Sequence, residues 1–298
     1  MSSQRSWRAA FVLVVLSTNG LLAQHRTTGC ANCAEENKAQ SPFLIFGNTY
    51  YVGTHGLSSV MITSPAGHVL IDGDLPESAS QIVKNIKSLG FRIEDVKLIV
   101  NSHVHFDHAG GIAELQRRSG ARIVASPWSA EVLRRGGVGR GDPQKGTITG
   151  IAPVKNLSRL HDSESFQVGD ITLTAHLTAG HTPGGTSWTW KSCEGSTCRE
   201  LVYADSLNPI SAPGFKFTNN RDYPQALDDF EKSFKFFETT PCDILITAHP
   251  EFSGMLEHQA ARERGVKPDP MVDSTACRRY AESGRAKLSG RLATEARK

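Results

Sequence analysis

Asn101–Gly110, NSHVHFDHAG, is the stretch of sequence from which fold and chemistry can both be inferred. It contains four side chains of the types that bind a divalent zinc ion at neutral pH: His103, His105, Asp107 and His108. Such groups are costly to bury without partners, so packing alone does not explain so dense a cluster. The apolar segment Val96–Val100 precedes the cluster, and apolar residues at helical spacing follow it in Ile112–Arg118. We therefore predict a strand-to-helix connection, a place where catalytic groups often collect.

The spacing within this cluster separates two pairs of ligands. His103 and His105 are two residues apart, so on an extended backbone their side chains point the same way. Asp107 and His108 are adjacent and cannot both face that direction, so the two pairs suit two metal ions. Each ion then needs further ligands. Two later histidines, His181 and His249, also follow apolar strands. Together with the first cluster they would bring three strand ends to one rim of a sheet.

Length and composition favour one globular domain. A chain of 298 residues with 39% hydrophobic residues can bury a sizeable core. The sequence has no internal repeat and no low-complexity run. The Gly/Arg-rich stretch Arg134–Gly150 indicates a surface loop rather than a linker. We expect a single domain that occupies residues 24–298.

The amino terminus predicts a secretory signal over residues 1–23. Arg5 and Arg8 precede the apolar run Ala9–Leu16, and cleavage is expected near Ala23. An uncleaved anchor is the alternative, but a spanning helix needs roughly 20 apolar residues. Cys30 lies too far beyond the run for a lipoprotein signal. We expect a periplasmic or secreted protein that makes no membrane contact after cleavage.

Loss of this leader lowers the formal net charge from +3 to +1, because it holds two arginines and no acidic residue. A charge this small argues against a nucleic-acid partner. The expected partner is a small molecule, and the expected state is a monomer.

Six cysteines in an exported chain suggest disulfides. One pair flanks a short turn, EGST, and another would join distant segments: Cys193 with Cys198, and Cys242 with Cys277. On the chain-entropy model, the disulfide that closes the longer loop would stabilise the folded protein by roughly 4 kcal/mol. Cys30 and Cys33 form C-A-N-C, for which a redox or zinc role, a local bridge and free thiols all remain open.

Hydrophobic periodicity predicts two strand-rich halves, each completed by helices. The expected strands are 44–52, 58–63, 68–72, 96–100, 122–125, 166–168, 171–176, 186–190, 201–204 and 243–247. The expected helices are 79–89, 112–118, 130–135, 223–239 and 273–292. Two sheets packed together with helices outside would bury all of these apolar faces.

The segment HVHFDH at His103–His108 matches the H-x-H-x-D-H signature of the metallo-β-lactamase superfamily. Five further segments resemble subclass B3 of that superfamily, and the resemblance covers nearly all of the mature chain: Ile45–Thr63, His68–Pro76, Thr178–Trp190, Tyr203–Pro209 and Asp273–Glu282. The resemblance implies an α/β fold, a four-layer αββα sandwich. It also implies two zinc ions per chain, held in a groove at the sheet rim.

The same resemblance assigns residues to each zinc ion. Those that resemble the ligands of the first zinc are His103, His105 and His181. Those that resemble the ligands of the second are Asp107, His108 and His249. Asp107 would also orient the attacking hydroxide. Ser206, at the position of a cysteine ligand in B1 relatives, and Asn208, at the position of a serine in some relatives, are candidate donors to a substrate carboxylate.

The implied activity is zinc-dependent hydrolysis of penicillins, cephalosporins and carbapenems, which would make a bacterium resistant to them. A thioesterase of the glyoxalase II type or a lactonase is the alternative, since such enzymes bridge both metals with an aspartate where Asp205 lies. A zinc-holding binding protein is a third interpretation, but purely structural zinc sites are closed by four protein ligands. Asp74 departs from the B3 pattern, because many relatives carry a glycine there.

Overall fold

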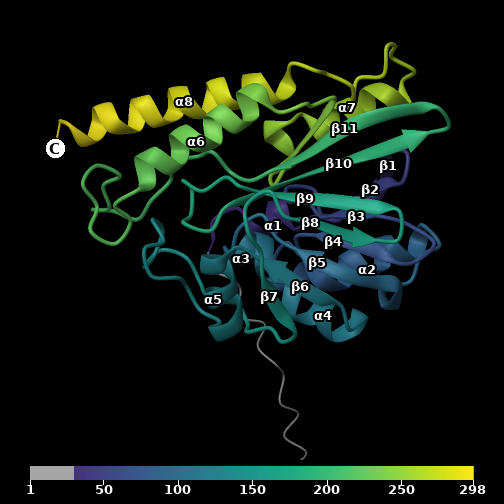
Figure 1. Ribbon diagram of the computed structural model, residues 1–298, viewed down its shortest axis with the longest axis horizontal. Helices are drawn as coiled ribbons and strands as arrows, with labels where there is room; N and C mark the ends of the chain where they lie inside the picture. The colour runs from purple at the N-terminus through teal and green to yellow at the C-terminus, as the bar shows by residue number, and fades with distance from the viewer. Residues whose placement is uncertain (1–29, 298) are drawn as a thin grey trace, which may run out of the picture.

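The computed structural model describes residues 30–297, so the leader expected at residues 1–23 lies outside it. Within the described range, a seven-stranded sheet packs face to face against a five-stranded sheet. Helices cover the outer face of each sheet, which gives four layers (Figure 1). The predicted αββα sandwich is confirmed. No helix in this range is both long enough and apolar enough to span a bilayer.

The first sheet is built from the first half of the chain. Its strands, in spatial order, are β1 (Phe43–Phe46), β2 (Thr49–Tyr51), β3 (Val60–Ile62), β4 (His68–Ile71), β5 (Val96–Val100), β6 (Arg122–Ala125) and β7 (Leu157–Arg159). The strands from β4 to β7 are parallel, and parallel neighbours need crossover connections. Those crossovers are the outer helices of this sheet: α2 (Ala79–Ser88), α4 (Ile112–Ser119) and α5 (Pro127–Arg135).

The second sheet comes from the second half of the chain. Its spatial order is β12 (Ile244–Thr247), β11 (Thr197–Ala204), β10 (Thr186–Glu194), β9 (Ile171–Leu177) and β8 (Ser165–Val168). Only β11 and β12 are parallel within it, and α6 (Ala226–Thr239) connects them. Helix α7 (Met255–Glu263) follows β12, and α8 (Ala276–Glu295) runs alongside α6 in the outer layer (Figure 1).

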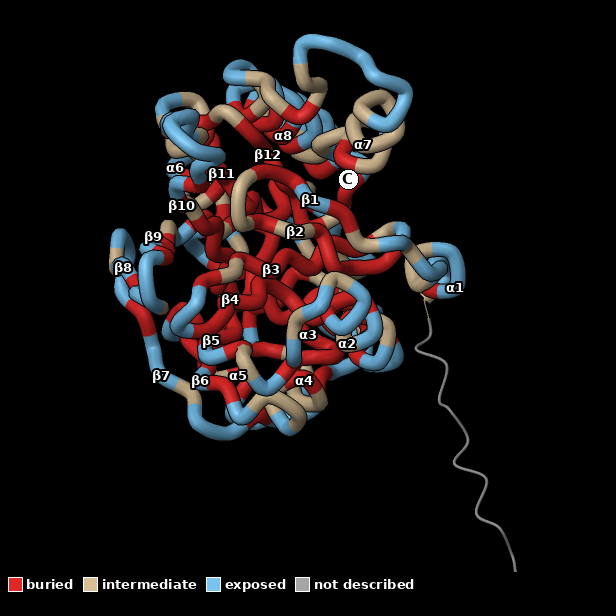
Figure 2. Tube along the Cα trace, turned by 90° about the vertical axis from the view of Figure 1, so that its right-hand side faces the viewer, coloured by how far each residue is buried: buried red, intermediate tan, exposed pale blue. Residues whose placement is uncertain are grey.

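Alternation along the strands divides the core into three layers, because successive side chains of a strand face opposite sides of the sheet. In β5, Leu98 packs between the two sheets, whereas Ile99 packs under the helices of the first sheet. In β11, Tyr203 packs between the sheets and Val202 packs against α6 and α8. Figure 2 shows buried segments running through both sheets, with exposed segments at the periphery.

The described cysteines form three disulfides: Cys30–Cys33, Cys193–Cys198 and Cys242–Cys277. The second closes the β10–β11 hairpin, and the third ties the start of β12 to α8. Both pairings agree with the cysteine spacing. For the C-A-N-C motif, the local bridge is the alternative that the structure selects.

Several element boundaries differ from the sequence prediction. The segment 44–52 is two strands, because Gly47 adopts a left-handed φ of 56° and turns the chain between Phe46 and Thr49. Helix α5 begins at Pro127, earlier than predicted, where the side chain of Ser126 caps it by accepting from the backbone N–H of Ser129. Strand β7 was not predicted, since its largely exposed residues carry no apolar pattern.

Candidate metal centre and active site

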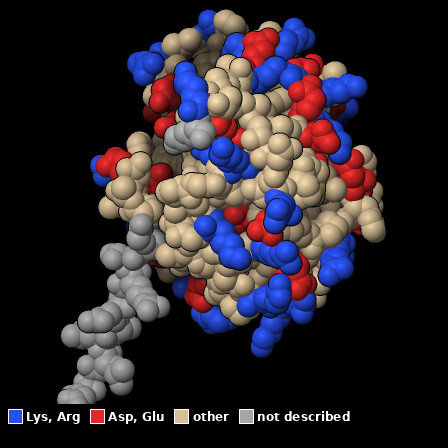
Figure 3. Space-filling model, turned by 90° about the vertical axis from the view of Figure 1, so that its left-hand side faces the viewer, with Lys and Arg blue, Asp and Glu red and all other residues tan. Residues whose placement is uncertain are grey.

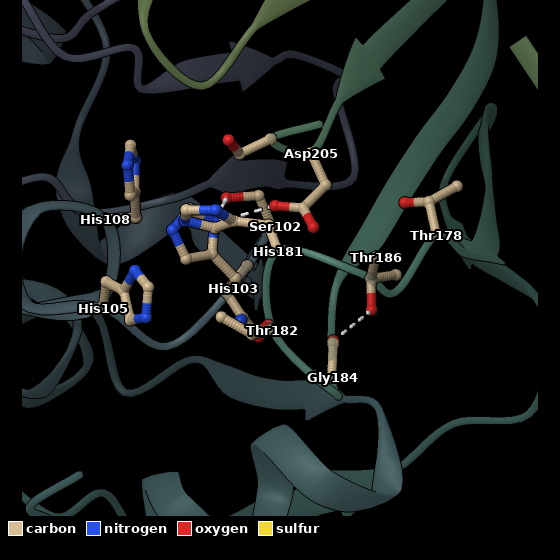
Figure 4. Close-up of polar contacts among 12 residues, drawn as sticks. Ser102, His103, His105, His108, Thr178, His181, Thr182, Gly184, Thr186 and Asp205 are labelled. Atoms are coloured by element: carbon tan, nitrogen blue, oxygen red, sulfur yellow. Dashed lines mark hydrogen bonds and ion pairs between the residues drawn. The ribbon is translucent and has the colours of Figure 1, made fainter. Parts of the chain in front are cut away.

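The predicted ligands all lie in the connections that follow strands. They are His103, His105, Asp107 and His108 after β5, His181 after β9, and His249 after β12. A single helical turn, α3 (Phe106–Ala109), carries the adjacent pair Asp107 and His108. Figure 4 shows the rings of His103, His105 and His181 close together, with His108 beside them. Segments far apart in the sequence therefore meet at one end of the two sheets.

Buried carboxylates hold two of the histidine rings from behind. Nδ1 of His103 lies 2.7 Å from Oδ1 of Asp205, and Nε2 of His105 lies 3.0 Å from Oδ2 of Asp142. Figure 4 shows Asp205 on the side of His103 away from His105. Burial opposes ionisation of Asp142, but His105 outweighs it and lowers the pKa of this carboxyl, so the carboxylate accepts from Nε2 of His105 and Nδ1 keeps its lone pair. Burial raises the pKa of Asp205 well above its usual range. A cation at Nε2 of His103 favours the ionised form of Asp205, which then accepts from Nδ1 of His103.

The third ring is held by the backbone. Nδ1 of His181 donates to the carbonyl oxygen of Asn208 at 2.6 Å, which leaves Nε2 without a proton. One nitrogen from each of His103, His105 and His181 lies within 4.8 Å of the others. Nε2 of His103 is buried and has no hydrogen-bond partner among the described residues. An orphaned buried lone pair of this kind is satisfied when the three nitrogens share a cation.

Burial sets the protonation of the cluster. It lowers the pKa of His103 well below its usual range and lowers the pKa of His181 to about 3, and neighbouring histidines add to both effects. Burial opposes ionisation of Asp107, but His108 and His249 outweigh it and hold the pKa of this carboxyl well below its usual range. At neutral pH the site therefore offers the neutral imidazoles of His103 and His181 and the carboxylate of Asp107, which are donors that zinc prefers.

Asp107, His108 and His249 form a second triangle of ligand atoms. Oδ2 of Asp107 lies 3.4 Å from Nε2 of His108 and 3.5 Å from Nε2 of His249. The two Nε2 atoms lie 3.1 Å apart. Ligands about 2.0–2.1 Å from a tetrahedral zinc ion lie roughly 3.3 Å from one another. The triangle therefore has the size that a zinc ion requires.

A network of hydrogen bonds around Asp72 lies next to His108 of the second triangle. Nδ1 of His108 lies 3.9 Å from Oδ2 of Asp72. The backbone N–H and the hydroxyl of Ser102 each donate to Asp72 at 2.6 Å, and the hydroxyl of Tyr203 donates to it at 2.8 Å. Burial raises the pKa of Asp72 to about 7, and these hydrogen bonds oppose the rise. Asp72 is thus a buried carboxyl group close to a predicted metal ligand, with no direct hydrogen bond to it.

The two triangles open into a pocket of about 450 Å³. Ser206 and Asn208 both line it, as do residues of the N-terminal segment such as Cys30 and Glu36. The backbone N–H of Asn208 donates to the Ser206 hydroxyl oxygen at 3.3 Å, so the hydroxyl hydrogen is available to a ligand. The structure thus places both candidate substrate contacts in the pocket, and their contact with a substrate stays a prediction.

Sequence reasoning did not identify Asp142, which orients His105. This residue lies in the stretch 134–150, which we interpreted as a surface loop because it is rich in glycine and arginine. The residue is nevertheless only 4% exposed, and its carboxylate also accepts from the backbone N–H of Gln144. An aspartate before a proline in a glycine-rich loop is common in turns, so no sequence signal distinguished it.

Comparison with known proteins is consistent with this site. Residues 50–194 match the metallo-β-lactamase superfamily. The Rm3 metallo-β-lactamase is 55% identical, with a TM-score of 0.87 over 90% of this chain and 99% of that enzyme. MEM-A1, a subclass B3 metallo-β-lactamase isolated from a soil metagenome library, is 48% identical, with a TM-score of 0.85 over 88% of this chain and 98% of that protein. The chain belongs to subclass B3 of the metallo-β-lactamase superfamily.

More distant superfamily members also align with this B3 chain. The N-acyl homoserine lactonase AttM of Agrobacterium fabrum is 31% identical over 157 residues, which are 43% of this chain and 57% of the lactonase. The chain thus spans little more than half the length of that relative. Family membership and the histidine cluster together support a hydrolase with a zinc-type metal centre.

Proposed function

We propose that this B3 metallo-β-lactamase binds two zinc ions and hydrolyses the amide bond of penicillins, cephalosporins and carbapenems, and so protects a bacterium from them. The observation that carries the proposal is its similarity to Rm3 over essentially the whole length of that enzyme. The complete set of converging ligand side chains adds support. The match to the lactonase is weaker and extends over a smaller part of that relative.

The side chains would divide the chemistry among them. One zinc would be held by His103, His105 and His181, and the other by Asp107, His108 and His249. Zinc in such sites polarises a carbonyl and lowers the pKa of a bound water, which supplies a nucleophile at neutral pH. Asp107, ionised and partly exposed to the pocket, would accept a hydrogen bond from the attacking water and so orient it. Ser206 and Asn208 would donate to the carboxylate beside the β-lactam nitrogen.

A lactonase or thioesterase is the second candidate, and the alignment with AttM favours it. In the glyoxalase II type an aspartate bridges the two metals at the position of Asp205. Here Oδ1 of Asp205 lies 2.7 Å from Nδ1 of His103, the ring nitrogen that faces away from the proposed metal site. Asp205 therefore contacts a predicted ligand rather than a metal ion. That position favours the β-lactamase proposal.

A substrate panel tests this proposal. Purified zinc-loaded protein is given a carbapenem, a cephalosporin, a penicillin, a thioester and an N-acyl homoserine lactone. We expect β-lactam hydrolysis that a chelator abolishes and added zinc restores. Hydrolysis of the thioester or the lactone alone would overturn the proposal.

We also propose that the protein works outside the cytoplasm on small molecules. Three disulfides suit an oxidising compartment. Positive and negative side chains are interspersed on the face shown in Figure 3, with no broad basic surface for a nucleic acid there. Expression of the full chain in a Gram-negative host should give a mature protein in the periplasmic fraction, with its N-terminus near Gln24. Retention of the leader on cytoplasmic protein would contradict this location.

A further inference from the structure

One face of helix α8 packs on the loop that carries Ser206 and Asn208. Tyr280, Gly284 and Lys287 are spaced by four and three residues, so they lie on the same side of the helix. The Tyr280 hydroxyl donates to the backbone carbonyl of Asp205 at 2.9 Å and accepts from the backbone N–H of Leu207 at 3.2 Å. Leu207 packs so closely on Gly284 that a Cβ atom there would lie 2.8 Å from the Leu207 Cβ. The helix therefore fixes the backbone of this loop.

Lys287 extends this contact to the side chain of Asn208. Its ammonium group donates to Oδ1 of Asn208 at 2.7 Å and lies 4.4 Å from the centre of the Phe252 ring. Asn208 and Phe252 both line the pocket. Since Oδ1 is bound by Lys287, the amide Nδ2 group remains as the donor, and it has no acceptor among the described residues. The backbone carbonyl of Asn208 meanwhile holds His181.

Apart from the proposed zinc ions, the side chains that line the pocket supply little fixed positive charge. No Lys or Arg occurs among the described residues that line it, and Glu36 and Glu251 are acidic. Lys287 is held at its edge by Asn208 and by the cation–π contact with Phe252. A cation fixed at two points next to an amide donor favours a ligand with a carboxylate at this side of the pocket.

We propose that Lys287 is a positioning residue: it turns the Asn208 amide so that Nδ2 donates into the pocket, and it makes the site select ligands that carry an anionic group. The inference rests on the proposed function only in naming the substrate carboxylate as that group. The selectivity itself belongs to the pocket and can be measured with ligands that are not substrates.

Calorimetry with two hydroxamates of similar size tests the selectivity. Both bind zinc, but succinic acid monohydroxamate carries a carboxylate and butyrohydroxamate does not. In zinc-loaded protein, Lys287→Met should weaken the acid about five- to tenfold and leave the neutral ligand within about twofold. Lys287→Arg should restore most of the loss. Lys235→Met, on the exposed face of α6, is the matched control and should change neither ligand.

A double variant tests the route through Asn208. Asn208→Ala should lower affinity for the acid by a similar factor, and adding Lys287→Met to it should cost little more. Equal weakening of both ligands by Lys287→Met, no weakening of either, or fully additive losses would overturn the proposal. Thermal unfolding of each variant checks that the fold is intact.

Kinetics separate this inference from the proposed function. For any β-lactam that the protein hydrolyses, Lys287→Met should raise KM with kcat within about twofold, since a substrate contact that persists in the transition state acts on binding. If no β-lactam is hydrolysed, the proposed function fails, while the hydroxamate selectivity still decides the role of Lys287.

Discussion

Asp205 and His103 form a hydrogen-bonded pair between two strand ends, with Oδ1 of Asp205 2.7 Å from Nδ1 of His103 and both side chains at most 1% exposed. The pair fixes the tautomer and the direction of a predicted metal ligand. The backbone of Asp205 is itself held by Tyr280 on α8 and by the Ser187 hydroxyl on β10. The orientation of one imidazole thus depends on three elements of the second half of the chain.

Replacing this carboxylate tests its supporting role. Burial raises the pKa of Asp205 well above its usual range, but a zinc ion on the far side of the His103 ring favours the ionised carboxylate. Asp205→Asn keeps the shape of the side chain but removes this charge, which makes His103 a better donor to the metal. We expect zinc affinity to fall about 10- to 100-fold, measured by competition with a chelating indicator. Asp170→Asn changes an exposed carboxylate and should leave affinity as it was. Unaltered affinity in Asp205→Asn would show that the pair is only structural.

His181→Ala tests the ligand assignment directly. Removing Nε2 of His181 leaves two imidazoles for the first zinc ion, so bound zinc should fall by about one ion per chain. Turnover of any substrate should fall by at least about 100-fold. Elemental analysis after dialysis gives the metal content. His161→Ala, on the exposed surface, is the control, and full zinc content in His181→Ala would refute the assignment.

The sequence allowed the centre of the fold and the ligands to be predicted because short-range patterns encode them. Strand β5 and the cluster after it occupy adjacent residues, and His181 and His249 each follow an apolar strand. Strand ends in a two-sheet sandwich share an edge, so these side chains were expected to meet. Hydrophobic alternation was sufficient to predict the layers.

Long-range contacts made by polar segments could not be predicted from such patterns. Asp142 supports His105 from an irregular loop, and Lys287 reaches Asn208 from a helix 79 residues further along the chain. Neither has a periodicity or a spacing that indicates its partner. Their roles depend on how these segments pack on the two-sheet core, and tertiary packing rather than local sequence determines that position.

Asp74 occupies a strained but well-bonded position. Its φ of 51° is left-handed, a conformation that favours glycine. Its carboxylate compensates by accepting from the backbone N–H of Thr54 at 3.1 Å and from the hydroxyl of Ser59 at 2.9 Å. Burial raises the pKa of this carboxyl to about 7, and these hydrogen bonds oppose the rise.

This raised pKa predicts a pH-dependent stability. The folded protein holds the proton more tightly than the unfolded chain, whose aspartate pKa is about 3.9. Stability from this group is therefore present below pH 4 and is lost as pH rises toward 7. In metal-free protein, Asp74→Asn should gain stability relative to the parent between pH 5 and 8, on the order of 2–4 kcal/mol. Urea unfolding at each pH measures the gain, and parallel pH profiles for the two proteins would contradict it.

The two disulfides of the second half should differ in their effect on stability. Cys242–Cys277 spans 35 residues and Cys193–Cys198 spans 5. Loop closure predicts a loss of about 4 kcal/mol when both cysteines of the longer loop become alanine, against about 2 kcal/mol for the shorter. Urea unfolding of the two double variants gives the comparison. Equal losses would show that strain or residual structure in the unfolded chain outweighs loop length.

Two glycines of α8 give a matched pair for the contact between this helix and the active-site loop. At Gly290 a Cβ meets nothing within 4 Å, whereas at Gly284 it would lie 2.8 Å from the Cβ of Leu207 and 2.9 Å from Cε1 of Phe234. Gly290→Ala should therefore stabilise the protein by about 0.5–1 kcal/mol through helix propensity alone. Gly284→Ala gains the same propensity but must move Leu207, so we expect a net loss of about 1–3 kcal/mol. Urea unfolding measures both, and equal stabilisation by the two substitutions would show that α8 does not press on this loop.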